Sequence, residues 1–207
     1  GRDEETWSLE YFVIPGDPSA PQVWADLDAV LFSSYHTEDG RELSVRATCV
    51  DTGGSHTQSV YRYIKTRESR RVFGIKGVGG EGRPLVGRPS KNNSGKVHLF
   101  PVGADTAKEL VYSRLKITEP GPGYCHFPKS RDPEYFEQLT AEQLVTRYVR
   151  GHAKRQWVKK RRRNEALDVR CYAMAALYIS GINVNIIANK RAESRDEEAE
   201  KPAPRPR

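Results

Sequence analysis

A strand–helix–strand rhythm between residues 43 and 75 constrains the fold of this chain more than any other feature. Leu43–Val50 (LSVRATCV) alternates early and ends in an apolar run, which predicts a strand, and Val72–Ile75 (VFGI) predicts a second, short strand. Between them, the spacing of apolar residues in Thr57–Ile64 predicts a helix. Because two parallel strands need a crossover connection, usually a helix, this rhythm predicts a parallel pair in an α/β sheet.

The remaining segments extend this alternation of strands and helices in both directions. We expect strands at 6–14, 97–102 and 124–127, and helices at 23–34, 106–115 and 139–149. Asp105 is expected to cap the helix that begins at 106. The stretch 77–95 is rich in Gly, Pro, Lys and Arg without periodicity, which predicts a long irregular loop. The length of 207 residues suits one domain with a tail.

A further helix is predicted near the C-terminus, and it contains an unusual acidic residue. Its apolar stripe, at steps of four, three and four, consists of Leu167, Cys171, Met174 and Tyr178. Asn164 stands where a capping residue is expected. Asp168 lies beside the stripe, where a carboxylate is costly unless it is capped, paired or bound to a cation. From this segment alone, a salt bridge to Arg163 or Arg170 and a bound cation both remain open.

The charge of the chain favours a polyanionic partner. The net charge is +7 at pH 7, and between Gln143 and Asn164 there are nine basic residues and no acidic one. A solvated face is the simpler interpretation, but a run this one-sided that also contains Trp157 is better explained by a polyanion. Three cysteines without paired spacing predict reduced core residues of a cytosolic protein. We find no signal peptide and no apolar run long enough to span a membrane.

Asp51 stands at the C-terminal end of the most convincing central strand, and two glycines follow closely. Ligands bind at this edge of open α/β sheets, and the glycines let a phosphate or metal approach the backbone. A simpler interpretation is that Asp51 or Ser55 caps the following helix. The Asp-Thr-Gly-Gly turn also occurs in phosphate-binding loops of sugar-kinase-like ATPases, so by itself it is a weak signal.

Asp51 and Asp168 together are more informative than either residue alone. A carboxylate at a strand end and another in a C-terminal helix form the divalent-metal site of nucleases with an RNase H-like fold. Carboxylate oxygens are the ligands that Mg²⁺ and Mn²⁺ prefer. We therefore expect an α/β fold with an RNase H-like mixed sheet flanked by helices, in which both residues bind Mg²⁺ or Mn²⁺ and act in catalysis.

Five sequence motifs, in their order along the chain, resemble the nuclease region of the large terminase subunit of lambda-type tailed bacteriophages. The resemblance runs from about Trp7 to Leu177 and is specific only as an ordered set. The motifs are Asp51-Thr52-Gly53-Gly54, Ile75-Lys76-Gly77, Gly103-Ala104-Asp105-Thr106-Ala107-Lys108, His126-Phe127-Pro128 and Arg162-Arg163-Asn164-Glu165-Ala166-Leu167-Asp168.

This resemblance implies a metal-dependent endonuclease domain of a DNA-packaging motor, which cuts concatemeric double-stranded DNA in the host cytoplasm by two-metal hydrolysis. Asp51 would be the second metal carboxylate and Asp168 the last. Family members carry a first acidic residue on an earlier strand, so we expect an N-terminally truncated nuclease domain at 1–188 and a disordered charged tail at 189–207. The implied partners are the terminase small subunit, the portal protein and an N-terminal ATPase domain of the same subunit, and no membrane.

The residues expected to contact the DNA backbone are all basic, and they lie at a strand end, in the 77–95 loop and its flank, and in the acid-free run. They are Lys76, Arg83, Arg88, Lys91, Lys96, Lys154, Arg155, Lys159, Lys160, Arg161, Arg162 and Arg163. Two other functions compete with the nuclease: a non-catalytic DNA-binding or motor-docking fragment of the same subunit, and a sugar-kinase-like phosphotransferase, for which a second phosphate loop is missing.

Overall fold

A computed structural model describes residues 1–91 and 96–199 of the chain. Its elements, in chain order, are η1 (Arg2–Glu4), β1 (Thr6–Trp7), α1 (Pro21–Leu31), β2 (Ser34–His36), β3 (Glu42–Ser44), β4 (Thr48–Asp51), α2 (Thr57–Lys65), η2 (Glu68–Arg70), β5 (Val72–Val78), β6 (Ser90–Lys91), β7 (His98–Gly103), α3 (Ala104–Leu115), β8 (Cys125–His126), α4 (Pro133–Leu139), β9 (Glu142–Val149), β10 (His152–Lys159), α5 (Glu165–Ser180) and α6 (Val184–Ala199).

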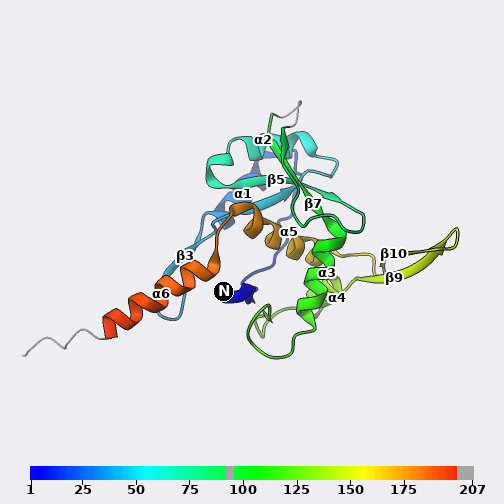
Figure 1. The fold of residues 1–207 in the computed structure, drawn as a ribbon. Coiled ribbons are helices and arrows are strands. Elements are labelled where there is room, and N and C mark those ends of the chain that lie inside the picture. The colour runs from blue at the N-terminus through cyan, green and yellow to red at the C-terminus, as the bar shows by residue number, and fades with distance from the viewer. Residues whose placement is uncertain (92–95, 200–207) are drawn as a thin grey trace, which may run out of the picture.

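The central sheet is mixed, and its strand order is β4-β5-β7-β6. Strands β4, β5 and β7 are parallel, whereas β6 runs antiparallel to β7 at one edge. The β4–α2–β5 unit confirms the parallel pair expected from the sequence, with Asp51 opposite Ile75. Helices lie on both sides of the sheet (Figure 1). The fold is therefore mixed α/β with flanking helices, as expected, and this arrangement is consistent with an RNase H-like fold.

Two hydrophobic clusters cover the two faces of the sheet. On one face, Ile75 packs with residues of α3, α4 and α5, among them the fully buried Leu167. On the other face, Ile64 of α2 packs with Val72, and Trp24 of α1 adds to this cluster. Along β4 the side chains alternate between the faces, because Val50 packs with the α2 cluster and its neighbour Cys49 with the α5 cluster. Asp51 therefore shares the α5 face.

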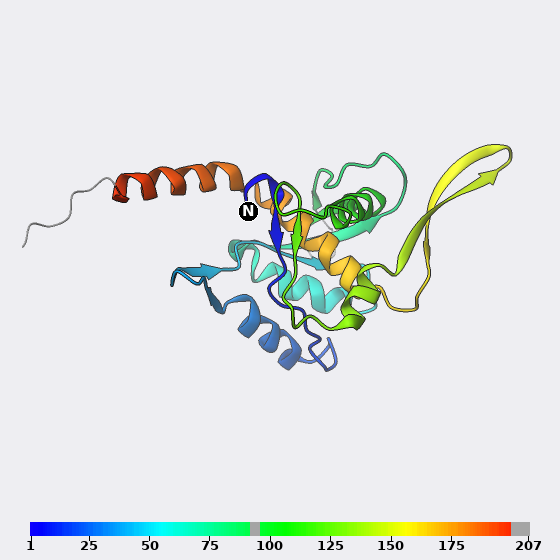
Figure 2. The ribbon, with the colours of Figure 1, turned by 90° about the horizontal axis from the view of Figure 1, so that it is seen from below.

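Two elements extend away from this body on opposite sides. The antiparallel β9–β10 hairpin projects beyond α3 and α4, and α6 projects in the other direction (Figure 2). Within the described residues, no single helix has the length and apolar character of a membrane span. The bent pair Glu165–Ser180 and Val184–Ser194, with 73° between its helices, passes that test by length and composition alone. All three cysteines are free, and Cys125 and Cys171 are buried.

Several sequence-based expectations about the first half of the chain need correction. The strand expected at 6–14 forms only over Thr6–Trp7, where it pairs with the two residues of β8. The strand expected at 43–50 is divided into β3 and β4. The loop expected at 77–95 contains β6 and the end of β5, while 92–95 lie outside the described residues. Asp105 does not cap α3; the cap position is Gly103, and the Asp105 carboxylate accepts a bond from Gly80 N.

The C-terminal half differs from expectation in two segments. The helix expected at 139–149 is instead the strand β9, and the preceding helix α4 was not anticipated. Residues 189–199 of the expected disordered tail belong to α6, whereas 200–207 lie outside the described residues. Asn183 explains the start of α6, because its side-chain oxygen accepts bonds from the backbone N–H groups of Asn185 and Ile186.

Candidate metal and nuclease site

Asp51 lies at the C-terminal end of β4 and is exposed. Its Oδ1 accepts a 2.9 Å hydrogen bond from Gly53 N, which closes the turn after the strand. A side chain at Gly53 would place its Cβ 3.2 Å from the same Oδ1, so the glycine permits this close approach. The helix-cap interpretation does not apply, because His56 occupies the N-cap position of α2 and forms no side-chain cap bond. Asp51 thus closes its own turn and leaves Oδ2 for other partners.

Asp168 lies in the first turn of α5 and is partly buried. Its Oδ2 accepts a 3.1 Å hydrogen bond from Asn164 Nδ2. The alternative of a salt bridge to neighbouring arginines is not realised. Arg163 pairs with glutamates of α4 and α5, and Arg170 donates to Thr6 and Cys125. Across residues 1–91 and 96–199, neither Asp51 nor Asp168 has an ion-pair partner.

Tyr172 links α5, the helix of Asp168, to Asp51 at the end of β4. It follows Asp168 by one helical turn on α5, and its hydroxyl donates a 3.2 Å hydrogen bond to Asp51 Oδ2. Burial raises the pKa of Tyr172, and the negative charges of Asp51 and Asp168 raise it further, so the phenol is a neutral donor at physiological pH. One side chain of α5 therefore places the end of β4 beside Asp168.

The electrostatic environment of Asp168 disfavours its ionised form and is only partly compensated by nearby lysines. Burial raises the pKa of this carboxyl group, and the charges of Glu142 and Asp51 also raise it, while Lys108 and Lys159 oppose the change. A raised pKa means that the ionised form is disfavoured where the carboxylate stands. A bound cation would remove this cost, since it would supply the positive charge that the two aspartates lack.

Glu142 is a third acidic residue near the site, and the sequence interpretation missed it. It is 4% exposed, its Oε2 is 2.7 Å from Lys108 Nζ, and its Oε1 accepts a 2.8 Å hydrogen bond from Asn164 Nδ2. Lys159 Nζ donates to Asn164 Oδ1 at 2.7 Å. Asn164 therefore joins Glu142 to Asp168, in addition to marking the start of α5. One signal was available, since Glu142 is the last acidic residue before the acid-free run.

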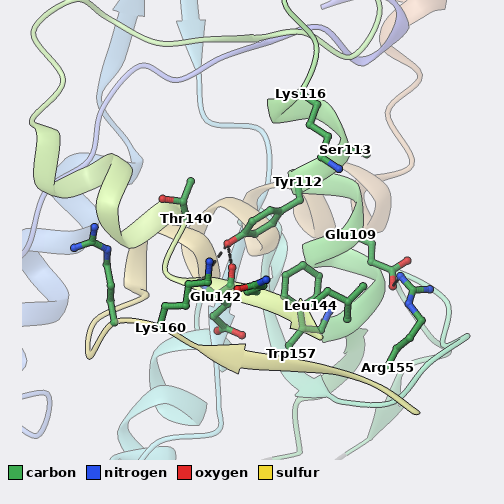
Figure 3. A pocket seen from close by; sticks show the side chains of 12 residues that line it. Glu109, Tyr112, Ser113, Lys116, Thr140, Glu142, Leu144, Arg155, Trp157 and Lys160 are labelled. Carbon is green, nitrogen blue, oxygen red and sulfur yellow. Dashed lines mark hydrogen bonds and ion pairs between the residues drawn. The ribbon is translucent and has the colours of Figure 1, made fainter. Parts of the chain in front are cut away.

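A pocket of about 760 Å³ opens between α3 and the base of the β9–β10 hairpin (Figure 3). Tyr112 of α3 fixes this base, because its hydroxyl bonds both the N–H and the carbonyl of Glu142. Trp157 of β10 packs against Tyr112 with ring centroids 5.0 Å apart. Lys116, Lys160 and other basic side chains line the same pocket. The hairpin is thus anchored beside the acidic residues.

The basic residues expected to contact DNA fall into two groups. Lys76, Arg83, Arg88, Lys91 and Lys96 are exposed around the β5 end and the following segments. The alternation of β5 turns Lys76 to the face opposite Ile75, so it does not lie on the Asp51 face. In the second group, Arg155, Arg161 and Arg163 pair with glutamates, while Lys154, Lys160 and Arg162 are exposed. Their contacts with DNA stay a prediction.

The donor set suits a hard divalent cation, but it is small. Among the described residues, no group of three or more His, Cys, Asp or Glu side chains is arranged to hold a metal ion. What the chain offers is the pair Asp51 and Asp168, both oxygen donors and both without a cationic partner. This pair fits part of a Mg²⁺ or Mn²⁺ coordination sphere, which usually keeps several waters.

Comparison with known proteins identifies the family. The sequence-family model of the terminase large subunit gpA endonuclease domain matches residues 1–191. The chain is 40% identical over 189 residues to the large terminase subunit of Escherichia phage lambda. This match covers 87% of the chain and 29% of the lambda protein. The chain is 36% identical over 209 residues to the large terminase subunit of Enterobacteria phage P21, covering 96% of this chain and 32% of that protein.

No solved structure matches the chain. The chain spans about three tenths of the length of the curated relatives it matches. The expected resemblance to lambda-type terminases is confirmed, and family membership gives the sugar-kinase-like alternative no support. This chain belongs to the family of terminase large subunit gpA endonuclease domains.

Proposed function

We propose that this chain is a Mg²⁺- or Mn²⁺-dependent endodeoxyribonuclease that hydrolyses phosphodiester bonds of double-stranded viral DNA during genome packaging. The observation behind the proposal is that Asp51 and Asp168 are close enough for the charge of one to raise the pKa of the other, while neither forms an ion pair in the described structure. Family membership supplies the reaction class. A two-metal mechanism is the finer form of this proposal.

Asp51 and Asp168 would hold the cation, and their neighbours keep the two carboxylates in place. When bound, the cation would activate a water and offset charge on the phosphate that is cleaved. Tyr172 donates to Asp51 and Asn164 donates to Asp168, so each carboxylate is oriented by a neutral donor that leaves its negative charge intact. Lys108 forms its ion pair with Glu142, so its positive charge offsets the negative charge of Asp168 only in part.

The charge distribution suits an approach of DNA from the hairpin side of this site. Lys154, Lys160 and Arg162 are exposed on β10 and just after it, and β10 ends beside Asn164 and the acidic residues. Phosphate contacts of this kind position a duplex without reading its sequence. The terminase small subunit, the portal protein and an ATPase domain of the same subunit stay proposed partners, and the infected host cytoplasm stays the proposed location.

Plasmid cleavage with matched variants tests the proposal. We expect the chain to nick or linearise supercoiled DNA with Mn²⁺ or Mg²⁺, and Asp51→Asn and Asp168→Asn each to reduce the rate at least about 100-fold. Both variants should still bind DNA, because the basic surface is unchanged. Asp26→Asn on α1 removes one carboxylate far from the site and should cleave like the unmodified chain. Full cleavage by either site variant would refute the assignment.

The second candidate is a non-catalytic DNA-binding or motor-docking fragment of the same subunit. It is favoured by the small donor set, since no third acidic residue among the described residues joins Asp51 and Asp168 as a metal group. The same plasmid assay separates the candidates. DNA binding without any cleavage, in Mn²⁺ as well as Mg²⁺, would establish the non-catalytic function for this chain.

A further inference from the structure

The outer half of the β9–β10 hairpin, residues 145–156, projects from the body of the molecule, and among the described residues its ion pairs to the body are those of Arg155 with Glu81 and Glu109. We call this segment the arm. Both views show it extending away from the sheet and its helices (Figures 1 and 2). Tyr148 is 77% exposed and Val149 is 52% exposed, although aromatic and branched side chains usually gain stability by burial. Folding alone therefore does not explain why these side chains occur in the arm.

Two cations face each other directly across the arm. The antiparallel register pairs Lys154 with Arg147, and both side chains are exposed. Like charges directly opposite in a strand pair are destabilising, so this pair weakens the hairpin that contains it. No acidic partner compensates for it, because within the described residues neither Lys154 nor Arg147 takes part in an ion pair. An external anion would turn this unfavourable pair into a binding site.

The turn at the tip of the arm contains a further residue that lowers stability. Arg150 and Gly151 form its two-residue turn, with φ angles of 52° and 82°. Two positive φ angles are typical of a type I′ turn, in which Asn-Gly is strongly preferred at these positions. An arginine in the left-handed region costs of the order of 1 kcal/mol. The turn therefore places a cation at the outermost point of the arm at the expense of stability.

We infer that the arm inserts into the major groove of duplex DNA, with Arg147, Arg150 and Lys154 contacting the phosphates and base edges there. A two-stranded β-ribbon fits the major groove, which is about 12 Å wide and 8.5 Å deep. Five strand residues on each side of the turn give the arm a reach of about 17 Å, more than the depth of the groove. The inference rests on the proposed function, because it concerns the same duplex that the acidic site would cut.

The base of the hairpin connects the arm to that site. Glu142 and Lys159 are paired in the register at its base, and both contact Asn164, which bonds Asp168. A duplex bound by the arm therefore lies over the side of the molecule that contains the acidic residues. The arm would fix how the duplex is oriented before a phosphodiester bond reaches Asp51 and Asp168.

The test compares two triple variants of the 207-residue chain that lower the net charge equally. The arm variant combines Arg147→Gln, Arg150→Asn and Lys154→Gln. The control variant removes three exposed cations distant from the arm, by Lys65→Gln, Lys190→Gln and Arg191→Gln. Asn-Gly suits the turn and the like-charge pair disappears, so the arm variant should be at least as stable as the unmodified chain. A loss of binding would then not reflect unfolding.

Binding is measured by fluorescence anisotropy on a duplex of about three helical turns without divalent cations, so that no cleavage occurs. We expect the arm variant to bind at least about ten-fold more weakly than the control variant. The slope of log K against log salt should fall in magnitude by about 3. Dimethyl sulfate footprinting locates the groove, because guanine N7 lies in the major groove. The unmodified chain and the control variant should protect N7 positions that the arm variant leaves reactive.

Each other outcome contradicts the inference in a recognisable way. Equal weakening by both triple variants would mean that net charge acts and the arm does not. Unchanged binding by the arm variant, or N7 protection that survives in it, would give the arm a different partner, such as an acidic protein surface. Failure of the unmodified chain to bind or cleave any duplex would refute the proposed function, and the inference with it.

Discussion

The acidic site lies beside the base of the β9–β10 hairpin and the arm forms its outer half, and the two regions differ in how their side chains are packed. Around Asp168 the neighbours are packed, since Leu167 is fully buried and Glu142 is 4% exposed. On the arm, Tyr148 is 77% exposed and two cations face each other. The packed end has its geometry fixed by folding. The exposed end contains residues that weaken the fold, so a binding partner is the better explanation for their presence.

The sharpest test of this contrast is a pair of truncations to alanine. Leu167→Ala removes a fully buried side chain from the α5 core and should lower the free energy of unfolding by about 2–5 kcal/mol. Tyr148→Ala removes a larger but exposed side chain and should change that free energy by less than about 0.5 kcal/mol. Urea denaturation of both variants measures the difference. Similar losses at the two positions would mean that the arm is part of the folded core.

Glu142→Gln is the next largest expected change, and it concerns the base of the hairpin. The Lys108–Glu142 pair is buried, with side chains 15% and 4% exposed, and removing one charge leaves the other uncompensated. We expect a loss of about 3 kcal/mol, measured by the same denaturation. Lys108→Met combined with Glu142→Met should recover part of this loss, because no unpaired charge then remains. If Glu142→Gln left the free energy of unfolding unchanged, the Lys108–Glu142 pair would not support the site.

Asp168→Asn is expected to have a smaller effect, with the opposite sign. The pKa of Asp168 is raised in the folded chain, chiefly by burial, so the ionised carboxylate lowers stability at pH values above its unfolded pKa of about 3.9. The variant should therefore be more stable than the unmodified chain at neutral pH without divalent cations. The difference should shrink as pH falls through the folded-state pKa and vanish well below about 3.9, where the carboxyl group is protonated in both states. Denaturation midpoints across this range test it, and a variant that is less stable at neutral pH would contradict it.

A small gain in stability is expected at the tip of the arm. Arg150→Asn alone should raise the free energy of unfolding by up to about 1 kcal/mol, because Asn tolerates a positive φ better than arginine. Thermal melts of the unmodified chain and of Arg150→Asn give the comparison. A gain in stability accompanied by weaker DNA binding would mean that Arg150 contributes to binding and lowers the stability of the fold. A loss of stability would mean that Arg150 has a structural role at the tip.

Local patterns were sufficient to predict the centre of the fold. The β4–α2–β5 unit follows from periods of 2 and 3.6 within short segments, and α5 follows from its apolar stripe. Asp51 and Asp168 were predicted because one ends a strand and the other disturbs an apolar helix face. The structure adds Tyr172, which donates from the helix of Asp168 to Asp51, and this could not be predicted because the contact joins positions far apart in the chain.

The hairpin could not be predicted for a physical reason. A strand is recognised by alternation between a buried and an exposed face, but most of β9 has no buried face, so 139–149 was interpreted as a helix. The Arg150-Gly151 turn lacks the Asn-Gly or Asp-Gly signal of a hairpin. Glu142 was missed for the same reason, because its role depends on where β9 begins. The helix α6 was mistaken for a tail because its charged composition resembles that of disordered segments.

Manganese binding tests the central claim most directly, because it needs neither DNA nor cleavage. Electron paramagnetic resonance titration counts free Mn²⁺ in the presence of the chain. We predict that the unmodified chain and Asp26→Asn bind Mn²⁺ equally, and that Asp51→Asn and Asp168→Asn each weaken binding at least about ten-fold. Unchanged Mn²⁺ binding in both site variants would contradict the claim that these two carboxylates share a cation.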